Sequence, residues 1–70
     1  MRNHKDYTIT LRDSTGKTHT LSINGECINE QIRDGVSEDV AVGDVEGNKI
    51  ANAIYNKEIG ADCWIESIDR

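Results

Sequence analysis

Hydrophobic and polar residues alternate along residues 7–23. Tyr7, Ile9 and Leu11 are separated by polar residues, and the alternation resumes after a break at residues 13–16. A period of two residues is typical of a β-strand whose two faces meet different surroundings. The break reads Asp-Ser-Thr-Gly, which offers side-chain hydrogen bonds and a glycine that tolerates positive φ. The pattern therefore predicts a β-hairpin, whose apolar face the rest of the chain must cover.

The segment that follows, residues 26–34, fits either a helix or a strand. Ile28 and Ile32 lie four positions apart, as on one side of a helix, and Gly35 is placed to end such a helix. Glu30 alternates with the same two isoleucines, as it would in a strand. Of these two interpretations we favour the short helix.

Two glycines limit the helix that the next residues can form. Residues 37–39 read Ser-Glu-Asp, which is typical of a helix start. Gly43 and Gly47 follow closely, and each costs about 1 kcal/mol relative to alanine in a helix interior. We therefore expect a short extended or turn-like piece over residues 40–45.

The main helix is expected over residues 49–57, with Asn48 as its cap. Ile50, Ala53 and Ile54 fall on one side of this segment when it is drawn as a helix. A helix with one apolar side needs an apolar surface to cover. It is therefore expected to lie across the hairpin.

A last strand is predicted over residues 62–68. In a regular strand Cys63 and Ile65 point one way, while Trp64 and Ile68 point the other. Both sides carry large apolar groups, so alternation does not say which side is buried. Of two interpretations for Trp64, a core residue that packs against the helix is favoured over a contact residue at the surface.

These elements predict one small α+β domain of 70 residues, with residues 1–6 as a polar tail. Its antiparallel β-sheet consists of the N-terminal hairpin and the C-terminal strand, and it packs against one main helix, with a short second helix beside it. At this length the burial of apolar surface only just offsets the loss of conformational entropy. A deep cleft is therefore not expected.

Acidic residues concentrate in the middle of the chain. The net charge is −5, and residues 26–46 carry seven carboxylates against Arg33 alone. Surfaces that bind phosphates need clustered lysine and arginine, so direct binding to nucleic acid or to an anionic membrane is disfavoured. A larger protein with a basic surface is the partner that this charge favours.

The two cysteines predict a reducing compartment. Cys27 and Cys63 form no Cys-x-x-Cys pair, and no apolar run is long enough for a signal sequence or a membrane span. We therefore expect free thiols and a cytoplasmic location.

No motif for catalysis or for a cofactor is present. The chain contains neither Gly-x-x-x-x-Gly-Lys nor Gly-x-Gly-x-x-Gly, the glycine-rich patterns that bind phosphates. Its carboxylate pairs have no spacing that is specific to a catalytic site. His4, His19, Cys27 and Cys63 could supply metal ligands by composition, but no two of them share a short turn, as zinc ligands normally do. We expect neither an enzyme nor a cofactor nor a metal site.

The acidic surface is the remaining candidate for function. Glu30, Asp34, Glu38 and Asp39 would share one face if residues 26–39 are compact. The alternative is that these carboxylates only keep the surface solvated. Seven residues are expected to contact a partner: Glu30, Asp34, Glu38, Asp39, Asp44, Glu46 and Tyr55.

The leading hypothesis is a non-catalytic inhibitor that presses its acidic surface against a larger basic protein, above all a nucleic-acid-binding one. In type it is similar to the small inhibitors that phages carry against host defences, including anti-CRISPR proteins, although no motif aligns it with a particular family. One alternative is a small-molecule or metal-binding module that uses the hairpin face and residues 43–49. Another is a self-associating structural subunit, such as a homodimer.

Overall fold

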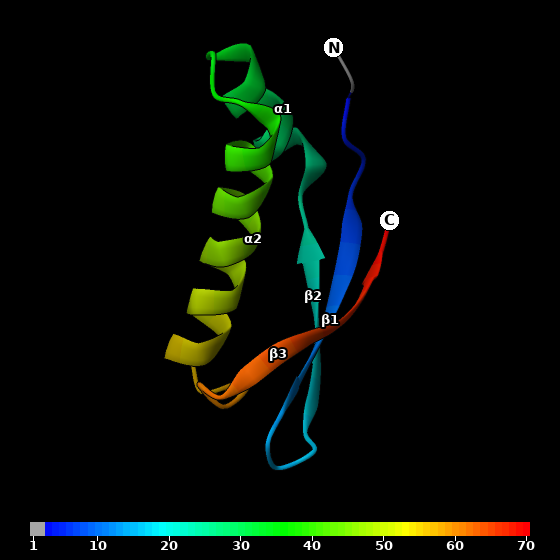
Figure 1. The fold of residues 1–70 in the computed structure, drawn as a ribbon, viewed down its shortest axis with the longest axis vertical. Helices are drawn as coiled ribbons and strands as arrows, with labels where there is room; N and C mark the ends of the chain where they lie inside the picture. Colours follow the sequence, from blue (N-terminus) through cyan, green and yellow to red (C-terminus); the bar gives the residue numbers. More distant parts are fainter. Residues whose placement is uncertain (1–2) are drawn as a thin grey trace.

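Two helices lie on one face of a three-stranded antiparallel sheet in residues 3–70, the part of the chain that the computed structural model describes (Figure 1). The order along the chain is β1 (Tyr7–Asp13), β2 (Thr18–Ile23), α1 (Gly25–Arg33), α2 (Glu38–Tyr55) and β3 (Cys63–Asp69). The predicted α+β class is confirmed, including the hairpin, the C-terminal strand, the main helix and the short second helix.

β1 is the central strand, because the strand order in the sheet is β2-β1-β3. In the hairpin register Tyr7 faces Ile23 and Ile9 faces Leu21, so the inward side chains of the two strands form adjacent pairs. The intervening polar residues lie on the other face of the sheet, which α1 and α2 do not cover. That open face is rich in threonine and serine hydroxyl groups.

Asp13 organises the turn between β1 and β2. Its side chain is buried and accepts hydrogen bonds from the Thr15 hydroxyl, from the Thr15 and Lys17 N–H groups and from the Gly60 N–H. These hydrogen bonds hold the pKa of the Asp13 carboxyl below its ordinary value, and the bond from the Thr15 hydroxyl has the largest effect. One carboxylate thus ties the hairpin turn to the loop that leads into β3.

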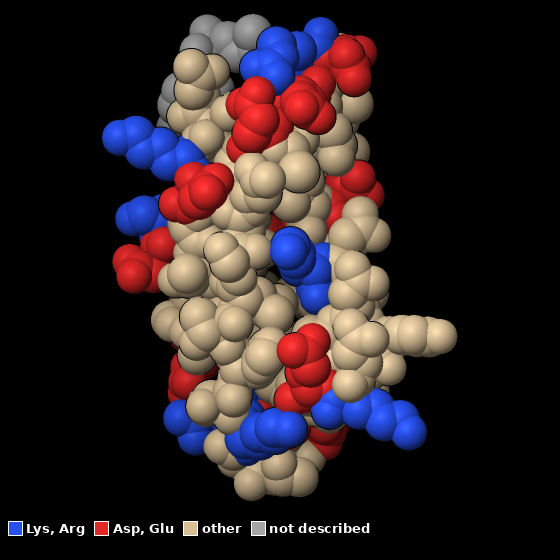
Figure 2. Space-filling view, turned by 180° about the vertical axis from the view of Figure 1, so that it is seen from behind, with Lys and Arg blue, Asp and Glu red and all other residues tan. Residues whose placement is uncertain are grey.

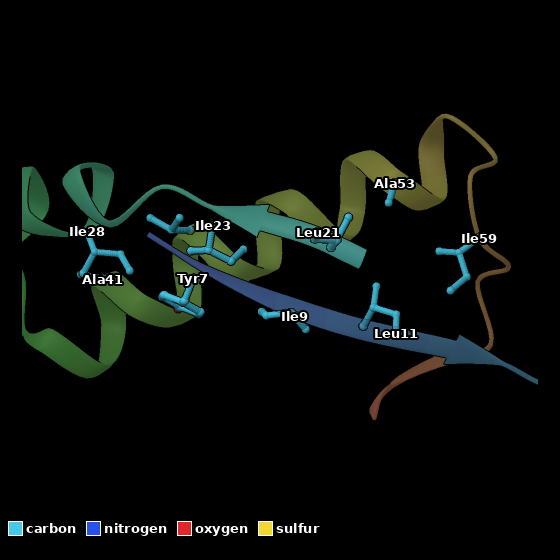
Figure 3. Close-up of a cluster of buried hydrophobic side chains, with 10 residues drawn as sticks. Tyr7, Ile9, Leu11, Leu21, Ile23, Ile28, Ala41, Ala53 and Ile59 are labelled. Atoms are coloured by element: carbon cyan, nitrogen blue, oxygen red, sulfur yellow. The ribbon is translucent and has the colours of Figure 1, made fainter. Parts of the chain in front are cut away.

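The core lies between the hairpin and α2 (Figure 3). Inward residues of β1 and β2 meet small residues of α2, so the helix approaches the sheet closely. The buried hydrophobic residues are Tyr7, Ile9, Leu11, Leu21, Ile23, Ile28, Ala41, Val45, Ala53 and Ile59. The predicted packing of the main helix across the hairpin is confirmed.

α2 is one continuous helix of 18 residues, so the prediction of an extended piece over residues 40–45 is wrong. Asn48 lies inside this helix rather than at its start. Gly43 and Gly47 face open space, where a side chain would meet no atom within 4 Å. Their propensity cost of about 1 kcal/mol each is offset by the burial of the apolar residues on the opposite side.

α1 begins at a capped position, which explains why the helix rather than the strand forms here. The side chain of Asn24 accepts a hydrogen bond from the Glu26 N–H at 2.9 Å, as an N-cap residue does. Ile28 is completely buried under this helix. The favoured interpretation of residues 26–34 as a short helix is confirmed.

The described part of the predicted polar tail is held against α1. The amide side chain of Asn29 bonds both backbone groups of His4, and the Asp6 carboxylate accepts the Gly25 N–H at 2.8 Å. Gly25 leaves room for this contact, because a Cβ there would lie 2.4 Å from the His4 carbonyl oxygen. Met1 and Arg2, the first residues of the predicted tail, lie outside the described residues.

β3 contains a bulge that the sequence pattern did not reveal. Thr10 pairs with Ser67 and the next residue, Leu11, pairs with Ile65, so Glu66 is the extra residue. The bulge places Ile68 on the same side of the sheet as Ile65, whereas regular alternation predicted opposite sides.

The expectation that Trp64 is a core residue is also wrong. Trp64 pairs with Arg12, whose side chain lies on the open face, and it is 48% exposed. The strand places it on the side of the sheet that α2 does not cover. The indole therefore lies at the surface.

Within residues 3–70, neither helix combines the length and the apolar character needed to cross a membrane.

Two glycine substitutions should have opposite effects on stability. Gly25→Ala should lower the free energy of unfolding by about 2 kcal/mol, because the new Cβ would collide with backbone atoms. Gly47→Ala should raise it by about 1 kcal/mol, because the side chain meets open space in a helix interior. Urea unfolding followed by circular dichroism measures both values. Equal effects of the two substitutions would contradict the packing described here.

Candidate functional site

The net negative charge of the molecule lies in the helical layer, the name we give to residues 25–55. Residues 25–55 contain seven carboxylates against Arg33 and Lys49, a net charge of −5, which equals that of the whole chain. In Figure 2 acidic side chains are frequent toward the end of the molecule where α1 lies, although lysine and arginine side chains lie among them. The acidic residues therefore form separate groups rather than one uninterrupted face.

The first acidic group lies on and just after α1. Arg33 bonds Glu26 at 2.9 Å, and this hydrogen bond is the main reason why the pKa of the Glu26 carboxyl lies below its ordinary value. Glu30 and Asp34 are exposed and make no side-chain hydrogen bond or ion pair within residues 3–70. These two carboxylates are therefore accessible to a partner.

The acidic residues of α2 lie on two different flanks of the helix. At 3.6 residues per turn, Glu38, Asp39 and Glu46 fall within about 100° of one another, and Asp44 falls on the opposite flank. Asp44 accordingly faces α1, where it accepts a hydrogen bond from the Gln31 side chain at 3.0 Å. α2 thus places the carboxylates that were predicted to contact a partner on two different sides.

Glu38 and Asp39 line a groove beside β1 that we call the Tyr7 groove. Its volume is about 290 Å³. At one end the Glu38 carboxylate lies 3.1 Å from His4 Nε2. The residues that line it are His4, Tyr7, Glu38, Asp39, Val42 and Arg70. The groove thus brings carboxylates, an aromatic ring and a guanidinium group together.

Tyr7, Glu46 and Arg70 form a connected polar cluster at this groove. The Tyr7 hydroxyl donates a hydrogen bond to Glu46, whose side chain is only 13% exposed. A guanidinium nitrogen of Arg70 lies 3.6 Å from the same carboxylate, and the guanidinium carbon lies 5.3 Å from the centre of the Tyr7 ring. Both distances suit an ion pair and a cation–π contact.

The environment of the Tyr7 phenol favours its neutral form. Burial and the adjacent Glu46 carboxylate raise its pKa to about 12, and Arg70 opposes this rise only in part. The phenol therefore acts as a hydrogen-bond donor throughout the ordinary pH range. It holds the Glu46 carboxylate in place beside the groove.

Tyr55 lies apart from the acidic groups. It is the last residue of α2, about 25 Å along the helix from Glu38, and it is 84% exposed. Tyr55 therefore shares no surface with the carboxylates at the other end of the helix.

The two histidines and two cysteines do not gather at one place. His4 pairs with Glu38, and His19 lies 3.7 Å from Glu58. Cys27 is exposed and Cys63 half-buried, and both are free thiols. Among residues 3–70, no three potential metal-ligating side chains gather in an arrangement that would hold an ion. Residues 43–49, assigned to a binding loop in one alternative, belong to α2 instead.

A second unusual surface is the apolar strip on β3. Ile65 and Ile68 lie on the same side of the sheet as α2, yet they are 44% and 39% exposed. The helix covers β1 and β2 but does not extend over β3. Within the described residues β1 is the only strand paired with β3, so the outer edge of β3 is open.

Sequence reasoning found the acidic residues but missed His4, Tyr7 and Arg70 as parts of a site. Tyr7 was assigned to the inward face of β1, and the one available signal was that a buried tyrosine needs a partner for its hydroxyl. No local pattern pointed to Arg70.

Comparison with protein-family models, curated proteins and solved structures finds no match to this chain.

The pKa of Tyr7 can be measured in a Tyr55→Phe variant, which retains a single tyrosine. Phenolate absorption should appear with a pKa of about 12. Because folding raises this pKa, Tyr7 contributes stability that is fully present below about pH 10 and is lost as the pH rises through about 12.

Adding Glu46→Gln should lower the pKa of Tyr7, whereas adding Glu30→Gln should leave it unchanged. A pKa near 10 in the folded Tyr55→Phe protein would contradict the proposed contact with Glu46.

Proposed function

We propose that this protein is a small, non-catalytic binding protein whose helical layer docks on a larger protein with a basic surface. The observation that carries the proposal is the charge of that layer, seven carboxylates against two cations. The carboxylates of Glu30, Asp34 and Asp39 make no side-chain hydrogen bond or ion pair within residues 3–70. Clustered charge of one sign steers a partner of opposite sign and speeds association.

The mode of action that we propose is blockade of a nucleic-acid-binding surface. Proteins that bind nucleic acids present clustered lysine and arginine to the phosphates, and a compact acidic protein competes for the same side chains. The inhibitors that phages use against host defences, including anti-CRISPR proteins, are the class of protein that we propose. The compartment would then be the cytoplasm.

The proposal is tested by neutralising four carboxylates of the helical layer together. The variant Glu30→Gln, Asp34→Asn, Glu38→Gln, Asp39→Asn should bind the basic partner recovered from a host extract about tenfold more weakly or worse. Its binding should also depend less on salt concentration.

A matched control removes the same number of charges from the other part of the molecule: Glu58→Gln, Asp62→Asn, Glu66→Gln and Asp69→Asn. This control should bind nearly as well as the unaltered chain, and adding the unaltered chain should release nucleic acid from the partner. Equal loss of affinity in both variants would show that only net charge matters. Unchanged affinity in the first variant would overturn the proposal.

A second candidate function, self-association, is favoured by the apolar strip on β3. An open strand edge flanked by exposed Ile65 and Ile68 offers main-chain hydrogen bonds and apolar burial to a second copy. Paired edges would join two sheets into one.

Sedimentation velocity at increasing concentrations tests this candidate. We expect a dimer whose population rises with concentration and which the Ile68→Lys substitution weakens by at least about tenfold, because the substitution buries a charge in the contact. The exposed Val40→Lys substitution on α2 serves as the control and should change nothing. A monomer at all concentrations would eliminate the candidate.

A further inference from the structure

The Tyr7 groove already holds one arginine side chain, that of Arg70. Arg70 lies over the face of the Tyr7 ring and beside the Glu46 carboxylate, at 5.3 Å and 3.6 Å respectively. Its side chain remains 62% exposed, whereas that of Glu46 is only 13% exposed. The receiving groups are therefore fixed by the fold, and the occupant is held loosely.

We propose that the Tyr7 groove is a binding site for an arginine side chain of the basic partner, which takes the place of Arg70. This inference rests on the proposed function, since it identifies the group of the partner that the acidic layer receives. Charge would steer the partner to the acidic layer, and the groove would receive one of its side chains in a specific pocket.

The chemistry of the groove suits a guanidinium group better than an ammonium group. The Tyr7 ring offers a flat face, on which a planar guanidinium stacks. Glu38 and Asp39 line the same groove, and Glu46 holds the Tyr7 hydroxyl beside it. These carboxylates suit the several N–H donors of arginine. A lysine ammonium would satisfy one carboxylate but would leave the ring face without a stacked partner.

The charge of the groove also favours a second cation. Three carboxylates lie on this flank of α2, and among residues 3–70 the facing cationic groups are Arg70 and, when it is protonated, His4. Arg70 contacts only Glu46 among these carboxylates, and His4 contacts only Glu38. Asp39 has no such contact within the described residues. The volume of about 290 Å³ gives an incoming side chain room to enter.

The rigidity of the receiving groups comes from the fold rather than from the ligand. Tyr7 is an inward residue of the central strand and is 7% exposed, and its hydroxyl fixes the Glu46 carboxylate. Val42 lies on the same flank of α2 and provides an apolar wall. A site whose groups are held in place before binding loses little conformational entropy when the ligand arrives.

The experiment uses the full chain and the blocked peptide acetyl-Gly-Arg-Gly-amide as the probe, followed by amide chemical shifts. Saturable shifts should map to the neighbours of Tyr7 and Val42. The Arg70→Ala variant should bind the peptide about fivefold more tightly, because it removes a loosely held internal competitor. Glu46→Gln should weaken binding by about fivefold or more.

Three controls distinguish a specific site from general attraction to an acidic protein. A peptide with citrulline in place of arginine keeps the shape but removes the charge and should not bind. A peptide with lysine should bind more weakly than the arginine peptide. Glu30→Gln removes one carboxylate of the α1 group and should leave the affinity for the arginine peptide unchanged.

The inference is overturned if the Arg70→Ala variant shows no saturable shifts at the groove, or if Glu30→Gln and Glu46→Gln weaken binding equally. The first proposal can survive that result, because neutralising the helical layer would still weaken binding to the partner. Conversely, the arginine peptide could bind at the groove while the fourfold variant still binds the partner with unchanged affinity. That pair of results would establish an arginine site and overturn the proposed docking function.

Discussion

The inward face of β1 is the constraint on which the whole structure depends. This strand is hydrogen-bonded on both edges, and every inward side chain along it is buried. Ile9 and Leu11 form the floor of the core, Asp13 fixes the turn at one end, and Tyr7 fixes Glu46 and the groove at the other. Stability and the candidate site therefore share one strand, and a change in its register would affect both.

The parts of the fold that follow from short-range patterns could be predicted from the sequence. The hairpin was predicted because its period of two residues is local. For α1 the spacing of Ile28 and Ile32 fitted a helix or a strand, and the helix was the favoured interpretation. The continuity of α2 could not be predicted in this way, because two glycines argue against it locally and only burial against the sheet favours it. The bulge in β3 was also missed, since it depends on pairing with Thr10 and Leu11 far away in the chain.

The candidate site, too, could be predicted from the sequence only in part. The acidic residues were found because composition reveals them, but their division between two flanks of α2 follows from a helix that the sequence did not predict to be continuous. The Tyr7 groove joins β1 to α2 through residues 39 positions apart. Long-range contacts of this kind leave no trace in spacing or periodicity, so an inward tyrosine is all that the sequence offers.

The bulge at Glu66 has a consequence for how β3 can carry charge. An extra residue on one strand adds a side chain to the open face without removing one from the face toward α2. Glu66 uses this additional position to accept a hydrogen bond from Arg12 at 2.8 Å, while Ile65 and Ile68 keep their places on the other side. The irregularity thus lets a strand of seven residues present an ion pair on one face of the sheet and two isoleucines on the other.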